Sequence, residues 1–171
     1  LPDVTNANCW AHARRAFADA VKAADKKDPQ AVKSSVAYRA LQKIAEFYSI
    51  DTGLKELPKE ERLKQRQEKI QPMVEEFFAW VKQQVSEYAV PPKSKTGQGL
   101  NFIINQEKYL KVFLTDGDVP IDNSASERAI RTFCVGKNNW MFHNTARGAE
   151  ASALVYSISE TAKLNNLRPY Y

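Results

Sequence analysis

The sequence predicts a mainly α-helical fold with one small β-hairpin toward the C-terminus. Apolar residues recur at helical spacing along most of the 171 residues, and aspartate, serine and proline stand where helices would begin. Only residues 4–9 and 133–142 have the β-branched or aromatic content, with flanking turn residues, that is typical of strands. Because 43% of the residues are apolar, the chain can bury one sizeable core, with or without an appended helical lobe.

Five helices are expected in the first 114 residues, after a short strand at residues 4–9. The apolar spacing places them at residues 10–24, 29–50, 58–70, 73–88 and 100–114. Asp28 and Pro29 mark the second start, because aspartate caps helices and proline suits the first helical position. Pro72 must kink a helix or begin one, because it lacks a hydrogen-bond donor. The mixed charges of residues 55–69 predict a solvated helix face, and residues 94–99 predict a loop.

The last third of the chain changes character at a dense turn, residues 115–120. The capping residues at 122–124 predict a short helix that runs to about Thr132. Residues 133–135 and 140–142 predict the two strands of the hairpin. A long final helix is expected at residues 148–166, and its small side chains would let it pack closely against a neighbour.

Composition excludes several classes of protein. No apolar run approaches the roughly 20 residues that span a bilayer, and the first four residues lack the features of a signal peptide, so a cytoplasmic protein is expected. Cys9 and Cys134 are too few and too far apart for a disulfide framework. The net charge of +5 is compatible with a polyanionic partner but does not identify one.

The helix after residue 122 carries the most suggestive chemistry. Glu127 and Arg131 are four residues apart with Arg128 beside them, so a carboxylate that could hold a divalent cation lies among guanidinium groups that could hold a phosphodiester. The opposite side of the helix would face a core through Ala125, Ala129, Ile130 and Phe133. A structural interpretation is also open, because Ser124 and Glu127 fit a capping box and Glu127 with Arg131 fits a surface ion pair. Spacing alone favours the structural interpretation and does not settle the choice.

Several blocks of the sequence resemble the insertion-sequence-sixty-six family of bacterial transposases. The C-terminal blocks are GDVPIDN at residues 117–123, SERAIR at 126–131, GKNNWMF at 136–142 and NTARGAEASA at 144–153. A further block, CWAHARRAF at residues 9–17, is similar to the other recognisable part of that family. The resemblance is specific in these blocks and diffuse across the helical middle.

The resemblance implies a catalytic core of ribonuclease-H-like fold whose metal is held by two aspartates and a glutamate. Glu127 matches the glutamate, as a catalytic residue and a ligand of Mg²⁺ or Mn²⁺. The family's aspartates would precede residue 1, so the chain alone is expected to be inactive; Asp116 and Asp118 belong to the turn before the Glu127 helix. Residues 1–17 would hold the last core strand and the start of the next helix, residues 18–114 an all-helical insertion, and residues 115–171 the C-terminal part of the core.

Cys9 and His12 stand three residues apart and admit several interpretations. A hydrolase pair lacks an orienting third group, and a zinc site with Cys134 and His143 has a spacing unlike compact zinc modules. A buried thiol beside a hydrogen-bonded histidine is the structural alternative. Related transposases carry a Cys-x-x-His pair that helps shape the core, so the resemblance implies supporting roles for Cys9 and His12, and Asp122 is given a supporting role as part of the turn and cap before Glu127.

DNA is the partner that the resemblance implies, at the element's ends and in the target, with a homo-oligomeric complex and accessory proteins as further partners. The candidate DNA-binding residues are Arg128, Arg131, Lys137, Asn138, Trp140 and Arg147. Arg147 would lie at a helix N-terminus, which favours phosphate, whereas Trp140 could equally pack in the core. Two alternatives stay open: a non-enzymatic helical DNA-binding or assembly module, and a degenerate transposase remnant.

Overall fold

A computed structural model of the chain describes residues 5–25, 29–87, 89–124, 127–128, 130–131, 134–135 and 145–168. The chain forms two compact units, Leu1–Asp122 and Asn123–Tyr171. All regular secondary structure within the described ranges is helical, which confirms the mainly α-helical prediction. The ribonuclease-H-like core stays a prediction, because those ranges contain no strand.

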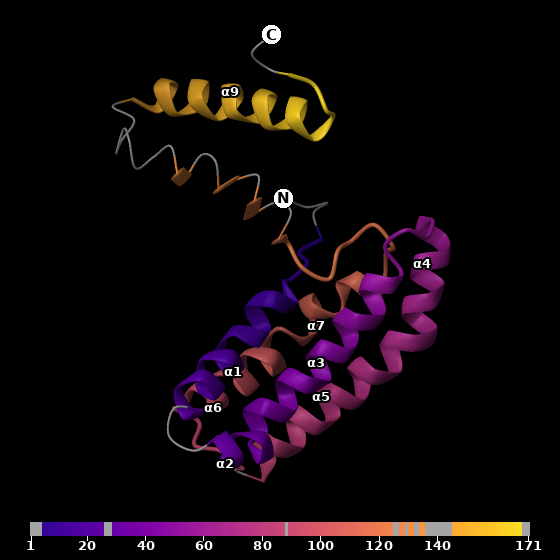
Figure 1. Cartoon of the computed structure of the whole chain (residues 1–171), viewed down its shortest axis with the longest axis vertical. Helices are drawn as coiled ribbons and strands as arrows, with labels where there is room; N and C mark the ends of the chain where they lie inside the picture. Colours follow the sequence, from indigo (N-terminus) through magenta and orange to yellow (C-terminus); the bar gives the residue numbers. More distant parts are fainter. Residues whose placement is uncertain are drawn as a thin grey trace. The chain divides into compact units, whose positions relative to one another are not determined.

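The first unit, called the helical unit below, is a bundle in which α1 packs against both α3 and α6, and α5 packs against α6 (Figure 1). Its elements are α1 (Trp10–Asp25), α2 (Pro29–Ser34), α3 (Val36–Gly53), α4 (Lys59–Gln65), the π-helical turn η1 (Arg66–Ile70), α5 (Gln71–Ser86), α6 (Lys95–Asn105), α7 (Glu107–Leu110) and the 3₁₀ turn η2 (Val112–Leu114). The helical unit contains residues 5–17 and the turn at 115–120 as well as the predicted insertion at residues 18–114. The division of the chain into an insertion and a catalytic core stays a prediction.

Trp10 lies at the centre of the helical unit's core. Its indole is fully buried, contacts the Phe47 ring edge-to-face at 5.2 Å between centroids, and lies 5.8 Å from the Phe77 ring centroid. The indole N–H donates to the Leu110 carbonyl at 2.8 Å, which satisfies the one polar atom that burial of a tryptophan would otherwise leave unpaired.

The segment before α1 is bonded to the end of the same unit. The Asn8 N–H donates to the Tyr109 carbonyl at 3.1 Å, and the Trp10 N–H donates to the Ile121 carbonyl at 3.2 Å. These bonds go to a helix end and a turn rather than to a neighbouring strand, so residues 5–9 do not form the strand we expected. The chain enters and leaves the helical unit at one place.

The helix expected at residues 100–114 is divided into the end of α6, α7 and η2. Two further differences from the predicted boundaries are explained by hydrogen bonds at serines. The helix expected at residues 29–50 is divided at Ser35, whose extended backbone and side chain cap α3 by accepting from the Tyr38 N–H at 3.2 Å. The loop expected at residues 94–99 is helical from Lys95, because Ser94 caps α6. Gly97 permits close packing there rather than a loop: a Cβ at this position would lie 2.3 Å from the Pro91 carbonyl oxygen.

The chain passes Pro72 without ending the helix. The Gln71 N–H bonds to the Arg66 carbonyl, five residues earlier, which is the π-helical pattern. This wider turn accommodates a proline that can neither donate a hydrogen bond nor fit the usual α-helical turn. The predicted kink or new helix at Pro72 therefore takes the form of the π-helical turn η1 followed directly by α5.

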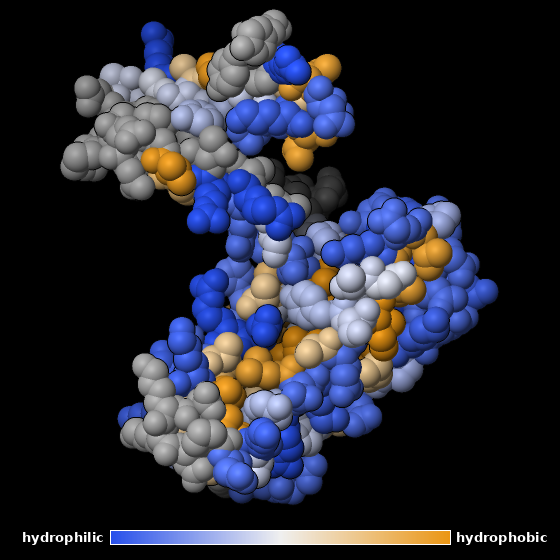
Figure 2. All heavy atoms as spheres, in the orientation of Figure 1, coloured by the Kyte–Doolittle hydropathy of each residue, from blue (hydrophilic) through white to orange (hydrophobic). Residues whose placement is uncertain are grey.

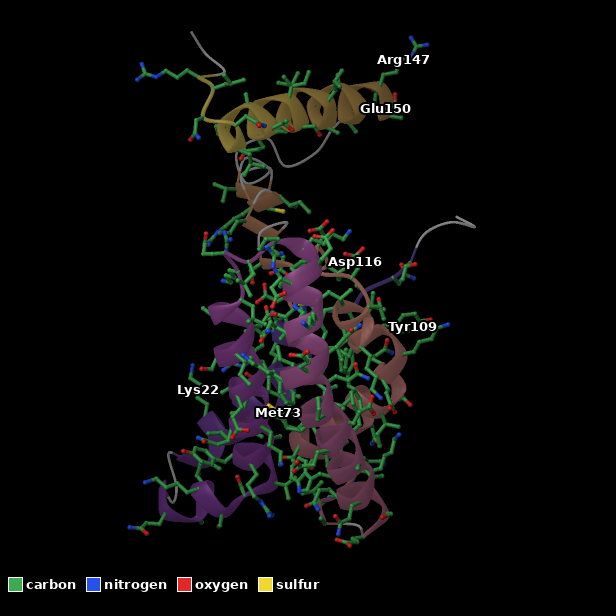
Figure 3. All side chains as sticks on the ribbon, turned by 90° about the vertical axis from the view of Figure 1, so that its right-hand side faces the viewer. Lys22, Met73, Tyr109, Asp116, Arg147 and Glu150 are labelled. Carbon is green, nitrogen blue, oxygen red and sulfur yellow. The ribbon has the colours of Figure 1, made fainter. Side chains whose placement is uncertain are left out.

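Residues 115–119, called the exit turn, are bonded to two cations, the exposed Lys59 of α4 and the buried Arg66 of η1. The Lys59 ammonium lies 3.0 Å from Asp116 Oδ1 and 3.1 Å from Asp118 Oδ2. The pKa of Asp116 is lowered, first by the Asp118 backbone N–H that donates to it and then by Lys59. Figure 3 shows Asp116 beside the upper end of the bundle. The turn predicted at residues 115–120 is confirmed, and its aspartates anchor it.

Arg66 is the buried part of this anchor. Its guanidinium is 3% exposed and donates from Nε to Asp51 Oδ1 at 2.7 Å. Nη1 donates to the carbonyls of Phe113 at 3.0 Å and Val119 at 2.8 Å. The prediction of a solvated face for residues 55–69 is wrong at this residue, because Arg66 satisfies carbonyls of a turn that lies about fifty positions further along the sequence.

A Gly117→Ala substitution is expected to destabilise the helical unit by about 1–3 kcal/mol, the usual cost of overpacking. An added Cβ would meet the Lys59 carbonyl oxygen at 2.1 Å, and neither backbone can move without breaking the exit-turn bonds. Gly53→Ala is the matched control, because nothing lies within 4 Å of its Cβ position. Urea unfolding of the two variants checks this; equal midpoints would contradict the close approach at Gly117.

The second unit contains α9 (Ala146–Leu164), close to the final helix predicted at 148–166. Thr145 caps its start by accepting from the Gly148 N–H at 3.0 Å. At its end Asn166 adopts a left-handed backbone (φ 58°), and the Leu167 N–H bonds to the Ala162 carbonyl, the pattern that closes many helices. No residue of α9 is buried, and its apolar side chains reach the surface (Figure 2).

One predicted strand is corrected in this unit. Cys134 and Val135, expected in the first strand of the hairpin, are helical. Residues 124–135 contain no glycine or proline, so the sequence has no helix breaker before these two residues. The second strand, residues 140–142, lies outside the described residues. None of the helices in the described ranges is long and apolar enough to cross a membrane.

Candidate functional site

Glu127 lies on a helix that starts immediately after Asn123. The Glu127 N–H donates to the Asn123 carbonyl at 3.0 Å, and every described residue from Ser124 to Val135 is helical. Asn123 is therefore the N-cap and Ser124 the first helical residue. The short helix predicted after residue 122 is confirmed.

This register differs from that of the predicted capping box. A capping box pairs the N-cap residue with the third helical residue, which here would pair Asn123 with Ser126. Glu127 is the fourth helical residue, one position beyond the glutamate of such a box. The backbone register therefore does not match the predicted Ser124–Glu127 capping box, and the metal-ligand role of Glu127 stays a prediction.

Three charged side chains of this helix line one open groove. Glu127, Arg128 and Arg131 are all exposed. The groove measures about 490 Å³, and its lining consists of Ser124, Glu127, Arg128, Ile130, Arg131 and Cys134. A carboxylate and two guanidinium groups can offer a cation ligand and phosphate donors on one surface. Ile130 was expected to face a core but is 59% exposed, because the described part of its unit offers it no packing partner.

The three residues predicted to have supporting roles, Cys9, His12 and Asp122, lie in the helical unit. Cys9 is the N-cap of α1, and its carbonyl accepts from the His12 N–H at 3.1 Å. Asp122 and Cys9 both lie near the hydroxyl of Tyr48, whose pKa is raised first by burial and then by the negative charge of Asp122. The structure thus joins two predicted residues through Tyr48, which sequence analysis missed because it appears only as one apolar position of α3. His12 is exposed and lines a separate groove between α1 and α6.

The described residues do not complete a metal site. Among them, no three histidine, cysteine, aspartate or glutamate side chains lie close enough together to hold one ion. Glu127 supplies one carboxylate, and its neighbours Arg128 and Arg131 are not ligands. The alternative zinc set is divided, since Cys9 and His12 belong to the helical unit, Cys134 belongs to the second unit, and His143 lies outside the described residues.

Arg147 is the remaining predicted phosphate contact that the structure describes. It lies in the first turn of α9, exposed, with Glu150 one turn later (Figure 3). The first turn carries no acidic residue, so the positive end of the helix dipole and the guanidinium reinforce each other. Lys137, Asn138 and Trp140 lie outside the described residues, and their DNA contacts stay predictions.

Comparison with known proteins identifies relatives of this chain. The sequence profile described as "Transposase IS66 family" matches residues 1–151. Among curated proteins of Sinorhizobium fredii (strain NBRC 101917 / NGR234), uncharacterized protein y4hP is 32% identical over 170 residues, which is 97% of this chain and 30% of that protein. Uncharacterized protein y4qI is 28% identical over 163 residues, 95% of this chain and 28% of that protein. The chain therefore spans less than a third of these relatives, and no solved structure matches it.

Proposed function

The chain belongs to the IS66 transposase family, and on this premise we propose that it is part of a longer protein that cleaves DNA at the ends of a mobile element and joins the freed ends to target DNA. The observation that carries the proposal is the groove in which exposed Glu127 lies beside Arg128 and Arg131 on one helix. That helix falls within the part of the chain that matches the family.

Glu127 is assigned one ligand position for Mg²⁺ or Mn²⁺, because carboxylate oxygen suits both ions. When bound, such ions activate an attacking hydroxyl and stabilise the leaving oxygen of a phosphodiester. The two aspartates that complete the site belong, on this proposal, to the part of the protein before residue 1. The 171-residue chain alone is accordingly expected to bind DNA without cleaving it.

The remaining predicted site residues are proposed to bind DNA or to position the Glu127 helix. Arg128, Arg131 and Arg147 neutralise backbone phosphates, with Lys137, Asn138 and Trp140 as further contacts of the same kind. Cys9, Asp122 and Tyr48 lie near one another where the chain leaves the helical unit, close to the start of the Glu127 helix in the sequence. None of these contacts reads a DNA sequence.

An Arg128→Ala/Arg131→Ala double variant of the chain is expected to lose affinity for duplex DNA and to show a salt dependence that is shallower by about 1.8, or 0.9 for each lost phosphate contact. Fluorescence anisotropy across a range of NaCl concentrations measures both quantities. Lys33→Ala/Arg39→Ala, which removes two exposed cations of α2 and α3, is the control for net charge. If the logarithm of affinity falls with the logarithm of salt concentration equally steeply for the Arg128→Ala/Arg131→Ala variant and the wild type, these arginines do not contact DNA.

The catalytic part of the proposal is tested on the longer protein. With Mg²⁺ it is expected to nick duplex DNA that carries an element end, and chelation of the metal is expected to stop the reaction. Intact DNA in the presence of either Mg²⁺ or Mn²⁺ would contradict the proposal.

A second candidate function is a non-enzymatic assembly module. It is favoured by the helical unit itself, which has its own buried aromatic core and hydrogen-bonds its own first and last segments together. The exposed apolar side chains of α9, including Leu154, Val155 and Ile158, add a surface through which copies could associate. This candidate predicts normal assembly and no loss of function when the Glu127 carboxylate is removed.

A further inference from the structure

A second groove lies within the helical unit, between α1 and α6. It measures about 310 Å³, and its lining consists of His12, Ala13, Arg15, Ala16 and Asp19 from α1 and Lys95, Gln98, Gly99 and Phe102 from α6. Small residues make the two helices approach closely beneath it: a Cβ on Gly99 would lie 2.8 Å from the Phe17 ring and 3.2 Å from the Ala16 Cβ. The groove floor is therefore rigid, and longer side chains form its rims.

The rims carry two cations, Arg15 and Lys95, for which the described residues provide no ion-pair partner. Arg15 on α1 and Lys95 on α6 are both exposed. Some lysines of the unit do form ion pairs, as Lys43 does with Glu76 at 2.9 Å and Lys111 does with Glu75 at 2.7 Å. Among the described lining residues Asp19 is the one acidic side chain, so Arg15 and Lys95 together leave the groove with a net positive charge.

An exposed aromatic ring lies in the same groove. Phe102 is 40% exposed and is the only large apolar side chain of the helical unit, within the described ranges, that is exposed to this degree. Every other phenylalanine of the core for which the structure gives an exposure is at most 2% exposed. Exposure of the Phe102 ring to water is unfavourable. The ring shares the groove with Gln98 and the two cations, so it can stack on a nucleotide base while the cations bind the phosphates of the same strand.

We propose that the α1–α6 groove binds a single-stranded segment of DNA, with Arg15 and Lys95 on successive phosphates and a base stacked on Phe102. The inference rests on the proposed function in taking DNA as the ligand, but it needs neither Glu127 nor a metal. The groove's volume is at the low end for small-ligand sites, a size that suits one unpaired nucleotide. An acidic peptide would satisfy the cations but would leave the Phe102 ring without a partner.

The test measures binding of the 171-residue chain to a fluorescent single-stranded oligonucleotide and to the matching duplex over a range of salt concentrations. Arg15→Ala/Lys95→Ala is expected to lower affinity for the single strand at least tenfold and to make its salt dependence shallower by about 1.4, or 0.7 for each phosphate. Phe102→Ala is expected to weaken single-strand binding by about 5- to 100-fold. Phe102→Leu, which keeps apolar bulk without a ring, is expected to behave like the alanine variant.

Lys33→Ala/Lys64→Ala removes two exposed lysines of α2 and α4 as the matched control, and far-UV circular dichroism confirms that each variant is folded. Single-strand binding by the groove variants within twofold of the control would overturn the proposal. Equal losses of affinity for duplex and single-stranded DNA would also overturn it. So would binding of poly-glutamate that depends on Arg15 and Lys95 when DNA binding does not depend on them. A Glu127→Gln variant that still cleaves would instead refute the catalytic assignment and leave the groove result standing.

Discussion

Replacing Glu127 with glutamine in the longer protein is expected to reduce Mg²⁺-dependent cleavage of element-end DNA by more than about 100-fold. Loss of a residue that merely supports a metal ligand costs 10–100-fold, so loss of a ligand itself should cost more. Glutamine keeps the size of the side chain and removes only the charge. DNA affinity is expected to be unchanged, because the phosphate contacts of Arg128 and Arg131 remain.

Glu150→Gln is the control for this experiment. Glu150 is an exposed glutamate on α9, and its neutralisation changes the net charge of the same compact unit by the same amount. The control is expected to cleave at the wild-type rate. A Glu127→Gln protein that cleaves as fast as the Glu150→Gln protein would show that Glu127 has a structural role only.

An Arg66→Ala substitution is expected to lower the free energy of unfolding of the helical unit by about 3–5 kcal/mol, the cost of breaking a buried ion pair. It leaves the carboxylate of Asp51, which is 4% exposed, without its cation. It also removes the donors to the Phe113 carbonyl of η2 and to the Val119 carbonyl of the exit turn. Urea unfolding followed by far-UV circular dichroism measures the change.

Lys43→Ala is the matched control, because it breaks an exposed pair whose Glu76 side chain is 72% exposed. Pairs of that kind contribute at most about 1 kcal/mol. An Arg66→Met/Asp51→Leu double variant is expected to recover part of the stability, since it leaves no buried charge unpaired. If Arg66→Ala unfolds at the same urea concentration as Lys43→Ala, the exit turn does not depend on this pair.

Local sequence patterns were sufficient to predict most helices. The spans of α1, α5 and α9 follow from apolar spacing and flanking caps, and the turn at residues 115–120 follows from its aspartates and glycine. The start of the Glu127 helix was also predicted, because Asn123 and Ser124 are capping residues. In each case the deciding interactions connect residues within about one helical turn.

Features that depend on distant residues could not be predicted. Arg66 was assigned to a solvated face because its neighbours in sequence are charged, and only the packing of the exit turn shows that it is buried. Gly97 and Gly99 indicated a loop, although both lie where a side chain would collide with another segment. Tyr48 meets Asp122 from seventy-four positions away in the sequence, so no local signal connects them.

The most direct test of metal binding by Glu127 is a change of metal preference in a Glu127→Cys variant of the longer protein. Thiolate is a softer ligand than carboxylate, and Mn²⁺ accepts it more readily than the hard Mg²⁺. The ratio of the cleavage rate in Mn²⁺ to that in Mg²⁺ is expected to rise well above the wild-type ratio, and to stay at the wild-type value in a Glu150→Cys control. An unchanged ratio for Glu127→Cys would contradict the assignment of this carboxylate to the metal.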